Sequence, residues 1–512
     1  MKARLLILVA AVCLGASLHA RAAEERTILF VDDHDILYRP ATRRVLHQPQ
    51  RHEANPLLTG PTIKHQVAYC SVHRDAATGR WQMWYQMTGA GVVVCYAESA
   101  DGIAWTKPVL DVLTFKGIPD RNVILTSPGH YDAAVIVDPA GGDAERRYKM
   151  AYWSIPPADA PENPKDPRGT GGGMFVAFSP DGIHWTKQPG PVLHGTYGRI
   201  VDPPLVGERQ TFGQLSSVSD VLDAMFDPLR KKYVVYSKAW IDGPDGRTFW
   251  KRAIARTESD DFLKWSAPQL VMAPDEFDGV RPAAFPGTRQ GVQLHGAPVF
   301  IRHGVYFSLL QVADFETHGQ QPVELAISRD GLAWSRPFRA TPFLPVNEAG
   351  KFDSGRIWSN ATPVVLGDEM RFYYGGAENP WTFGKDEKEW GSKKKLPQTG
   401  IGLATLPLDR FAGLRPLEKI AQVTLRPRSL AGVKNITLNA AAKDGAVRVE
   451  ILNAEGYRIP GFTKADAVPM TADDISQEAR WKEKQLTDLP PDRYILRVHL
   501  EKAELFAVTL KP

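Results

Sequence analysis

The protein has 512 residues, about three times a typical domain length, so we expect at least two domains. Hydrophobic residues make up 43% and charged residues 23%, a balance typical of folded globular proteins that argues against disorder. The formal net charge of +4 is close to zero for this length and gives no reason to expect nucleic acid or an anionic membrane as a partner.

The first 23 residues are predicted to be a secretory signal peptide. A basic start at residues 1–4 precedes an apolar run at 5–18, and a small-x-small cleavage pattern ends at Ala22. The apolar run is too short to span a bilayer comfortably, and no later stretch of about 20 apolar residues follows. We therefore expect a secreted or periplasmic protein without a membrane span.

One turn motif recurs along the chain: Ser-x-Asp-Gly, a hydrophobic residue, any residue, and Trp. Three full copies begin at Ser99, Ser179 and Ser328, and a degenerate copy with Phe262 in place of Gly begins at Ser259. Asp-Gly favours a tight turn because Gly tolerates positive φ and Asp caps the local backbone. We expect the turn aspartates to be structural, namely Asp101, Asp181 and Asp330. The motif tryptophans are expected to be buried between neighbouring sheets, namely Trp105, Trp185, Trp265 and Trp334.

Two strands joined by a short turn precede each copy of the motif, and a fifth pair follows the last copy. The strand pairs are predicted at residues 66–73 with 81–86, 133–137 with 148–153, 222–226 with 233–238, 297–301 with 305–311, and 362–366 with 370–374. In the fifth unit a third strand at 400–406 is followed by a turn at 407–413 instead of the motif. Pattern and spacing therefore predict five units of about 50–60 residues, each a small antiparallel sheet.

Such units cannot bury both of their faces alone, and stacking them around an axis solves this while protecting the sheet edges. We therefore predict a five-bladed β-propeller over residues 24–417, with residues 27–37 completing the last blade and closing the ring. An open run of hairpins or a sandwich is the alternative. From residue 418 the repeat stops, and alternating or β-branched segments predict a C-terminal antiparallel β-sandwich over 418–512. The predicted fold class is all-β.

Three short segments add a resemblance to a known superfamily. They are Leu29-Phe30-Val31-Asp32-Asp33-His34, Arg146-Arg147-Tyr148-Lys149-Met150 and Phe352-Asp353-Ser354-Gly355. With the predicted propeller and sandwich, the chain resembles glycoside hydrolase families 43 and 32, within an exported bacterial branch of the five-bladed β-propeller glycoside hydrolase superfamily. The resemblance implies a carbohydrate substrate, cleavage of glycosidic bonds in an oligo- or polysaccharide, and three acids in the first three blades.

Four aspartates are candidate catalytic residues. Asp132 and Asp220 lie where the innermost strands of the second and third units begin, the end that faces the channel mouth in a propeller. The resemblance implies a modulator or stabilising role for Asp132 and the acid role for Asp220, although Glu is usual at the latter position. The first unit offers no acid, so Asp353 or Asp33 is expected to supply the base or nucleophile. The structural alternatives are strand capping, a braced turn at Asp353 and an anchored closing strand at Asp33.

The substrate-binding candidates are His65, His295, Trp358, Asn360 and Trp381. Indole faces stack on sugar C–H surfaces, so the two tryptophans, on or near an inserted loop, are expected to wall a subsite. Each histidine can equally be a hydrogen-bonded structural residue, and each tryptophan can pack against the loop itself. No spacing of Cys and His indicates a metal site, and we expect no cofactor.

These observations predict an exported glycoside hydrolase that uses channel-mouth carboxylates. Glycoside hydrolysis needs two carboxyl groups across the scissile bond, one protonated and one ionised. The missing acid in the first unit favours the alternative, a non-catalytic carbohydrate-binding propeller. Two or three carboxylates at one mouth would indicate the enzyme, whereas a single acid among aromatic residues would indicate the binding protein.

Overall fold

The structure is a computed structural model that describes residues 25–512 with several gaps. The gaps are residues 90, 127–130, 139–141, 155–171, 196–217, 242–249, 276, 279–290, 316–318, 360–361 and 382–395, and the side chains of residues 131–133 are also not described. The predicted signal peptide at 1–23 therefore lies outside the described residues. In the part of the chain that the structure describes, no helix is long and apolar enough to cross a membrane.

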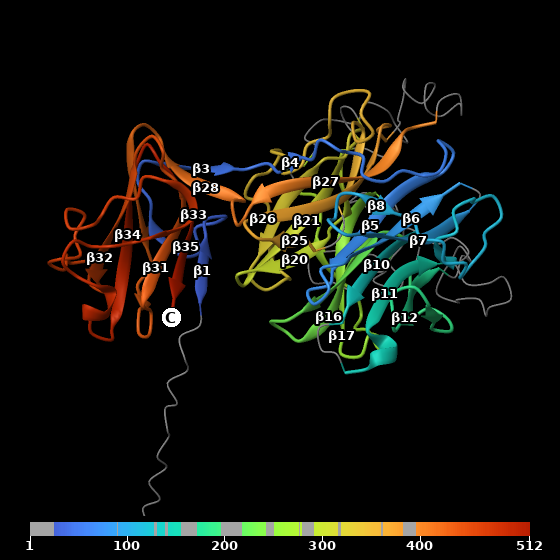
Figure 1. Ribbon diagram of the computed structural model, residues 1–512, viewed down its shortest axis with the longest axis horizontal. Helices are drawn as coiled ribbons and strands as arrows, with labels where there is room; N and C mark the ends of the chain where they lie inside the picture. Colours follow the sequence, from blue (N-terminus) through green and yellow to red (C-terminus); the bar gives the residue numbers. More distant parts are fainter. Residues whose placement is uncertain are drawn as a thin grey trace, which may run out of the picture.

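The described residues form β-strands joined by turns, with two 3-10 helices of three residues each, η1 (Ala144–Arg146) and η3 (Leu486–Asp488). This confirms the predicted all-β class. The strands build seven antiparallel sheets. Figure 1 shows them in two groups, which we call the five-sheet ring and the two-sheet unit.

The five-sheet ring follows the predicted strand pairs in chain order. Sheet 1 holds β5 (Gln66–Arg74), β6 (Trp81–Thr88), β7 (Val92–Ser99), β8 (Trp105–Thr106) and β9 (Val123–Thr126). Sheet 2 holds β10 (Tyr131–Val137), β11 (Tyr148–Ser154), β12 (Gly173–Ser179), β13 (Thr186–Lys187) and β14 (Leu193–His194). Sheet 3 holds β15 (Leu222–Asp227), β16 (Lys232–Ile241), β17 (Lys251–Ser259) and β18 (Gln269–Met272).

The last two sheets complete the ring. Sheet 4 holds β19 (Val292–Gly296), β20 (Val299–Arg302), β21 (Val305–Asp314), β22 (Val323–Ser328) and β23 (Trp334–Ser335). Sheet 5 holds β24 (Arg356–Ser359), β25 (Val364–Leu366), β26 (Glu369–Ala377), β27 (Thr399–Pro407) and β4 (Gln50–Arg51). Each sheet contacts the next through or beside its innermost strand, and β24 of sheet 5 returns to β5 of sheet 1, so the innermost strands surround a channel.

The two-sheet unit combines both ends of the described chain. One of its sheets contains β3 (Thr42–Leu46), β28 (Ala412–Pro416), β35 (Glu504–Lys511), β31 (Asn435–Ala441), β33 (Asp473–Glu478) and β1 (Arg26–Leu29). The other contains β2 (Ile36–Tyr38), β29 (Ile420–Leu425), β34 (Arg493–Glu501), β30 (Arg428–Ser429) and β32 (Ala446–Asn453). Their facing side chains share one core, so the unit begins with the N-terminal strands and resumes at residue 412 instead of 418.

The expectation that residues 27–37 close the ring is wrong. The strand that joins the fifth sheet is β4, whose Arg51 and Gln50 pair with Ala404 and Thr405 of β27. The segment that begins with β1 is apolar on both faces because each face packs against a different group of sheets. Ile28 packs in the core of the two-sheet unit, whereas Leu29 packs with ring residues, so this segment lines the interface between the two groups of sheets.

The recurring motif forms the same hydrogen-bonded turn in all four copies. In the first copy, the Ser99 hydroxyl accepts from the Gly102 amide at 2.9 Å, and one Asp101 oxygen accepts from the amides of Ile103 and Ala104 at 2.8 and 2.9 Å. These bonds help to lower the pKa of Asp101 because they favour its charged form. Equivalent bonds at Asp181, Asp261 and Asp330 confirm that the turn aspartates are structural.

Each turn also joins its sheet to the preceding sheet. The Trp84 indole of sheet 1 donates to the Gly182 carbonyl of sheet 2, and the Tyr236 hydroxyl of sheet 3 donates to the Gly331 carbonyl of sheet 4. Sheet 2 has the small Ala151 at the place that Trp84 and Tyr236 occupy. In the next turn Phe262 replaces Gly and packs in the same core as Ala151, at a φ of 65°. The degenerate copy therefore compensates for a missing aromatic ring.

The prediction that the motif tryptophans are buried between the sheets is wrong in degree. Trp105, Trp185, Trp265 and Trp334 are all half-buried. Trp105 does contact Tyr373 of the neighbouring sheet, with ring centroids 6.0 Å apart. The fully buried position of the turn belongs to the Gly or Phe that precedes each tryptophan by three residues, because that residue lies under the preceding sheet.

Candidate functional site

Three of the innermost strands carry a β-bulge near the end where the chain enters the strand. The bulge residues are Tyr69 in β5, Asp132 in β10 and His295 in β19. Tyr69 and Asp132 occupy equivalent places in their sheets, and His295 lies one step away. Bulges redirect side chains and are common next to active sites. Tyr69 also has a φ of 37°, an uncommon conformation for a residue other than glycine.

The bulges bring residues of different sheets together at this end of the channel, which we call the mouth. The Tyr69 hydroxyl lies 3.2 Å from His295 Nε2, which links sheet 1 to sheet 4. The Tyr69 ring also lies 5.5 Å from the Trp358 ring of sheet 5. Val221 of sheet 3 packs in the same cluster, so the mouth is a point of convergence for four sheets.

Trp381 forms one wall of the mouth. Its ring centroid lies 5.1 Å from that of His295, and its indole nitrogen donates to Gln321 Oε1 at 2.8 Å. The guanidinium groups of Arg252 and Arg356 lie 5.0 and 4.7 Å from its ring, within the range of cation–π attraction. Trp381 is half-buried, so part of its surface remains accessible.

Arg356 is a cation enclosed among aromatic residues. Its guanidinium lies 5.0 Å from the Trp358 ring and donates to the backbone carbonyl and side-chain oxygen of Asn379 at 2.9 and 2.7 Å. Burial lowers its pKa to about 10, and Tyr69 partly opposes that shift. Arg356 is therefore still charged at neutral pH and contributes positive potential to the mouth.

Asp220 lies at the mouth, as expected, but it is paired. It is buried one residue before Val221 and forms an ion pair with the buried Lys238 of β16. The Ser219 hydroxyl also donates to its Oδ1 at 3.1 Å. A neighbouring ammonium favours the charged carboxylate, which is the form of a base or nucleophile and not that of a proton donor. The acid role expected for Asp220 therefore does not fit its surroundings.

The backbone of Asp132 reaches the same end of the channel through its bulge, but its side chain is not described. Asn360 lies outside the described residues. Trp358 and His295 are buried at the mouth, as described above. The structure therefore brings together Asp220, His295, Trp358 and Trp381.

Asp353 does not face the mouth, which contradicts its expected catalytic role. Its side chain is 0% exposed, accepts from Arg51 Nε at 2.7 Å and from the Tyr374 hydroxyl at 2.9 Å, and accepts from Asn347 at 3.1 Å. Arg51 belongs to β4, the strand that closes the ring. Oδ2 of Asp353 thus attaches β4 through Arg51, and Oδ1 accepts from Asn347, so both oxygens have structural partners. This structural role differs from the turn bracing that the sequence suggested.

Asp33 and His65 are also committed elsewhere. Asp33 lies between β1 and β2 and forms ion pairs with Arg39 and Arg44, which lower its pKa despite partial burial. It belongs to the two-sheet unit and not to the mouth. The two ring nitrogens of His65 lie 2.8 Å from Thr62 Oγ1 and 2.8 Å from the Gly117 carbonyl, so this histidine holds a loop.

A cavity of about 410 Å³ lies along the channel and is lined by residues of β5, β10, β15 and β20 and by Thr362, which precedes β25. Its walls are mostly apolar, and they include Asp223 and His73. Burial raises the pKa of Asp223 to about 7, although the amides of Ala224 and Val299 partly oppose the shift. At neutral pH, Asp223 is therefore present in both its protonated and its charged form, inside a mostly apolar part of the channel.

Sequence reasoning missed Tyr69, Lys238, Arg356 and Asp223. A bulge changes the alternation of a strand, so Tyr69 and its neighbours appear as one continuous buried run. Lys238 and Asp223 lie within predicted strands. A polar residue there interrupts the alternation of polar and apolar residues but does not by itself indicate a functional site. Among the described residues, no group of three or more His, Cys, Asp or Glu side chains lies close enough to hold a metal ion.

Comparisons with known proteins are distant. No family model matches the chain, and no curated protein matches it. The chain is similar in structure to a glycoside hydrolase at 16% identity, covering 71% of this chain and 94% of that chain with a TM-score of 0.44. It is also similar to an N-acetylgalactosamine deacetylase from F. plautii, solved in complex with blood group B trisaccharide, at 17% identity over 71% and 96% with a TM-score of 0.43. A thermostable family-43 glycoside hydrolase is similar at 15% identity over 68% and 91% with a TM-score of 0.40.

Proposed function

We propose that the protein is an exported glycoside hydrolase whose five-sheet ring is a five-bladed β-propeller and whose two-sheet unit is a β-sandwich. Its substrate site is the mouth, formed by Tyr69, His295, Trp358 and Trp381. The observation that carries this proposal is a half-buried indole and a tyrosine–histidine pair at the end of the channel where the buried Asp220 directly precedes Val221 of the mouth cluster. Aromatic surfaces with a few fixed polar groups are the usual composition of small-ligand sites.

The chemistry requires two carboxyl groups in different protonation states. Asp220, paired with Lys238, supplies the ionised carboxylate that acts as base or nucleophile. Asp132 is then the candidate proton donor, since its backbone bulge in sheet 2 lies at the same end of the channel as that of Tyr69 in sheet 1. This assignment reverses the roles that the resemblance implied. Trp381 provides the wall on which a sugar ring stacks.

A non-catalytic carbohydrate-binding protein is the second candidate. The observation that favours it is the structural use of Asp353 and Asp33, which leaves Asp220 as the catalytic candidate whose carboxylate is described at the mouth. Both candidates place the saccharide at the same aromatic wall. They differ only in whether a bond is broken.

Turnover on a panel of aryl glycosides and polysaccharides separates the two candidates. Asp220→Asn alone leaves the buried Lys238 ammonium without its carboxylate, so this variant is expected to destabilise the fold. An unpaired carboxylate at the mouth would contribute little to stability. The informative variant is therefore Asp220→Asn with Lys238→Met, which removes both charges. The enzyme proposal predicts that this variant folds and loses about 10²- to 10⁴-fold in kcat.

The matched control is Asp260→Asn, which breaks an exposed ion pair with Lys232 in the same sheet. It should retain full activity. Full activity of the double variant would refute the role of Asp220. Saccharide binding without turnover on any substrate of the panel would establish the binding protein instead.

A further inference from the structure

The outward face of one sheet in the two-sheet unit carries an ordered set of polar residues. In this sheet β34 lies between β29 and β32, and Gln422, His499 and Arg448 are cross-strand neighbours. Thr424, Arg497 and Glu450 form the next row. The residues between these rows, such as Val423, Val449 and Val498, point into the core. Strict alternation therefore places one face of the sheet in the core and gives the other a polar composition.

One residue of this face, Glu450, is a buried carboxylate. Glu450 is 0% exposed and lies 2.9 Å from His499 Nε2, 3.1 Å from Arg458 Nε and 3.5 Å from Arg497 Nη1. Arg497 also donates to the Tyr38 hydroxyl at 2.7 Å. A buried carboxylate with three basic partners fixes their positions, so the polar face is organised before any ligand arrives.

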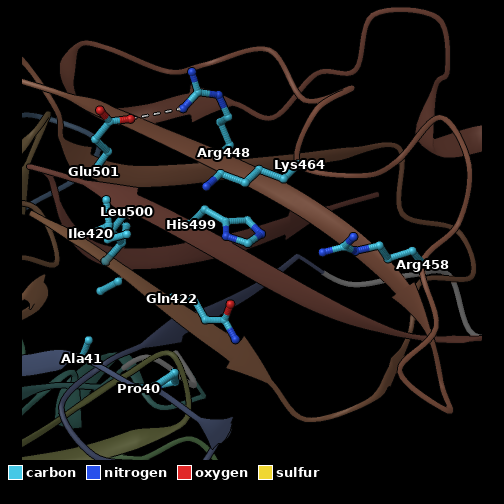
Figure 2. Close-up of a pocket in the computed structure, with 11 residues that line it drawn as sticks. Pro40, Ala41, Ile420, Gln422, Arg448, Arg458, Lys464, His499, Leu500 and Glu501 are labelled. Carbon is cyan, nitrogen blue, oxygen red and sulfur yellow. Dashed lines mark ion pairs between the residues drawn. The ribbon is translucent and has the colours of Figure 1, made fainter.

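An open pocket of about 400 Å³ lies over this face (Figure 2). Figure 2 shows Arg448, Lys464 and Arg458 around His499, with Gln422 nearby. Pro40, Ala41 and Ile420 line the opposite side, and Ile420 is 66% exposed. The pocket thus has a cationic side and an apolar side.

The positive charges of the pocket exceed its negative charges. The acids beside it are Glu450, which is buried and already shared, and Glu501, which lies 3.7 Å from Arg448. Lys464 forms no ion pair with any of the described residues. Burial lowers the pKa of His499, against the opposing effect of Glu450, so the imidazole is neutral at pH 7 and its Nε2–H donates to that carboxylate. The net charge of the pocket is therefore carried by arginine and lysine.

We propose that this pocket binds an acidic sugar residue, with its carboxylate between Arg448 and Lys464 and its C–H face against Ile420 and Pro40. Arginine presents paired donors that match the two oxygens of a carboxylate. The volume accommodates a unit of about one or two sugar rings. That the ligand is a saccharide rests on the proposed function, whereas its negative charge rests on the pocket alone. The pocket would hold an acidic polysaccharide while the mouth acts on it.

Binding of oligogalacturonate to the full mature chain, measured by calorimetry, tests this proposal. The double variant Arg448→Gln with Lys464→Gln should weaken the affinity at least tenfold. Arg480→Gln is the matched control, since it removes an exposed arginine paired with Glu478 on the other sheet, and it should change nothing. A neutral cello-oligosaccharide should not compete.

Three results would overturn the proposal: equal affinity of the double variant, equal affinity for the neutral oligosaccharide, or complete displacement by inorganic sulfate at the same concentration as the sugar. Trp381→Ala separates this proposal from the proposed function. Loss of turnover in Trp381→Ala with retained oligogalacturonate binding would place the two sites apart, as proposed. Binding lost in Trp381→Ala but retained in the double variant would assign the acidic sugar to the mouth and refute the pocket.

Discussion

The five-sheet ring and the two-sheet unit hold their charges in different ways. In the ring, Asp220 and Lys238 neutralise each other inside the protein, and Arg356 lies against aromatic rings. In the two-sheet unit, Glu450 is buried but its partner Arg458 extends into solvent, with a side chain that is 72% exposed. The mouth therefore presents aromatic surface with its cations enclosed among aromatic rings, whereas the pocket presents cations towards solvent, including Lys464, which has no ion pair among the described residues. The first suits a sugar ring, and the second suits an acidic group.

The largest expected effect comes from breaking a buried pair of the ring. Arg51→Met leaves the fully buried Asp353 without its cation and detaches β4 from the ring, so it should lower the free energy of unfolding by about 3–5 kcal/mol. Chemical denaturation measures this loss. Arg43→Met, at an exposed arginine in the neighbouring β3, is the control and should be almost neutral. A near-neutral Arg51→Met would mean that Asp353 is not needed for closure and would reopen its catalytic role.

The next effect depends on pH and concerns Asp223, a buried carboxyl group with no ion pair among the described residues. The pKa of Asp223 is about 7 in the folded protein and 3.8 in its ordinary state. Between these values the unfolded chain releases a proton that the folded protein keeps, so stability is full below about pH 4 and falls as pH rises towards 7. The loss amounts to about 4 kcal/mol at most.

Asp223→Asn should remove this part of the pH dependence and stabilise the protein at pH 8. Denaturant titrations at pH 5 and pH 8 provide the measurement. Asp227→Asn is unsuitable as a control because Asp227 accepts from the Tyr306 hydroxyl at 2.7 Å. Asp368→Asn, at an exposed aspartate in the turn between β25 and β26, is the better control. An unchanged difference between the two pH values in Asp223→Asn would show that Asp223 is ionised in the folded state.

The smallest expected effect concerns Arg448, a cation of the pocket in the two-sheet unit. Arg448 and Glu501 are partly exposed and 3.7 Å apart, so Arg448→Ala should change the free energy of unfolding by less than about 0.5 kcal/mol. Thermal unfolding at low and high salt measures it. A loss of several kcal/mol would show that Arg448 stabilises the fold, and it would remove the argument that this cation is available to a ligand.

The repeating architecture could be expected from the sequence because its causes are local. An Asp-Gly turn and two alternating strands recur in a fixed order, and the five sheets of the ring follow that order. Closure of the ring could not be expected, since a strand with two apolar faces suits a sheet of the ring and an interface equally. The residues that actually close it, Arg51 and Asp353, are 302 positions apart, and neither has a local signal for the other.

The site could be expected only in part for a similar reason. The positions of Asp220, His295 and Trp358 follow from the place of each in its repeat. Tyr69 depends on a bulge, and the pairing of Asp220 with Lys238 depends on the register between β15 and β16. Such partners are set by tertiary structure, so the sequence indicated which acid lies at the mouth but not its charge state.

Saccharide affinity of two tryptophan variants tests the central claim, that the mouth is the carbohydrate site. Trp381 and Trp265 are both half-buried in the ring, but Trp381 lies at the mouth and Trp265 in a repeat turn. For a saccharide that the wild-type protein binds or cleaves, Trp381→Ala should weaken affinity about tenfold, since an aromatic contact contributes up to about 1.5 kcal/mol beyond the area that it buries. Trp265→Ala should retain wild-type affinity in the folded protein. Equal affinity of Trp381→Ala and the wild type, with both proteins folded, would contradict the account.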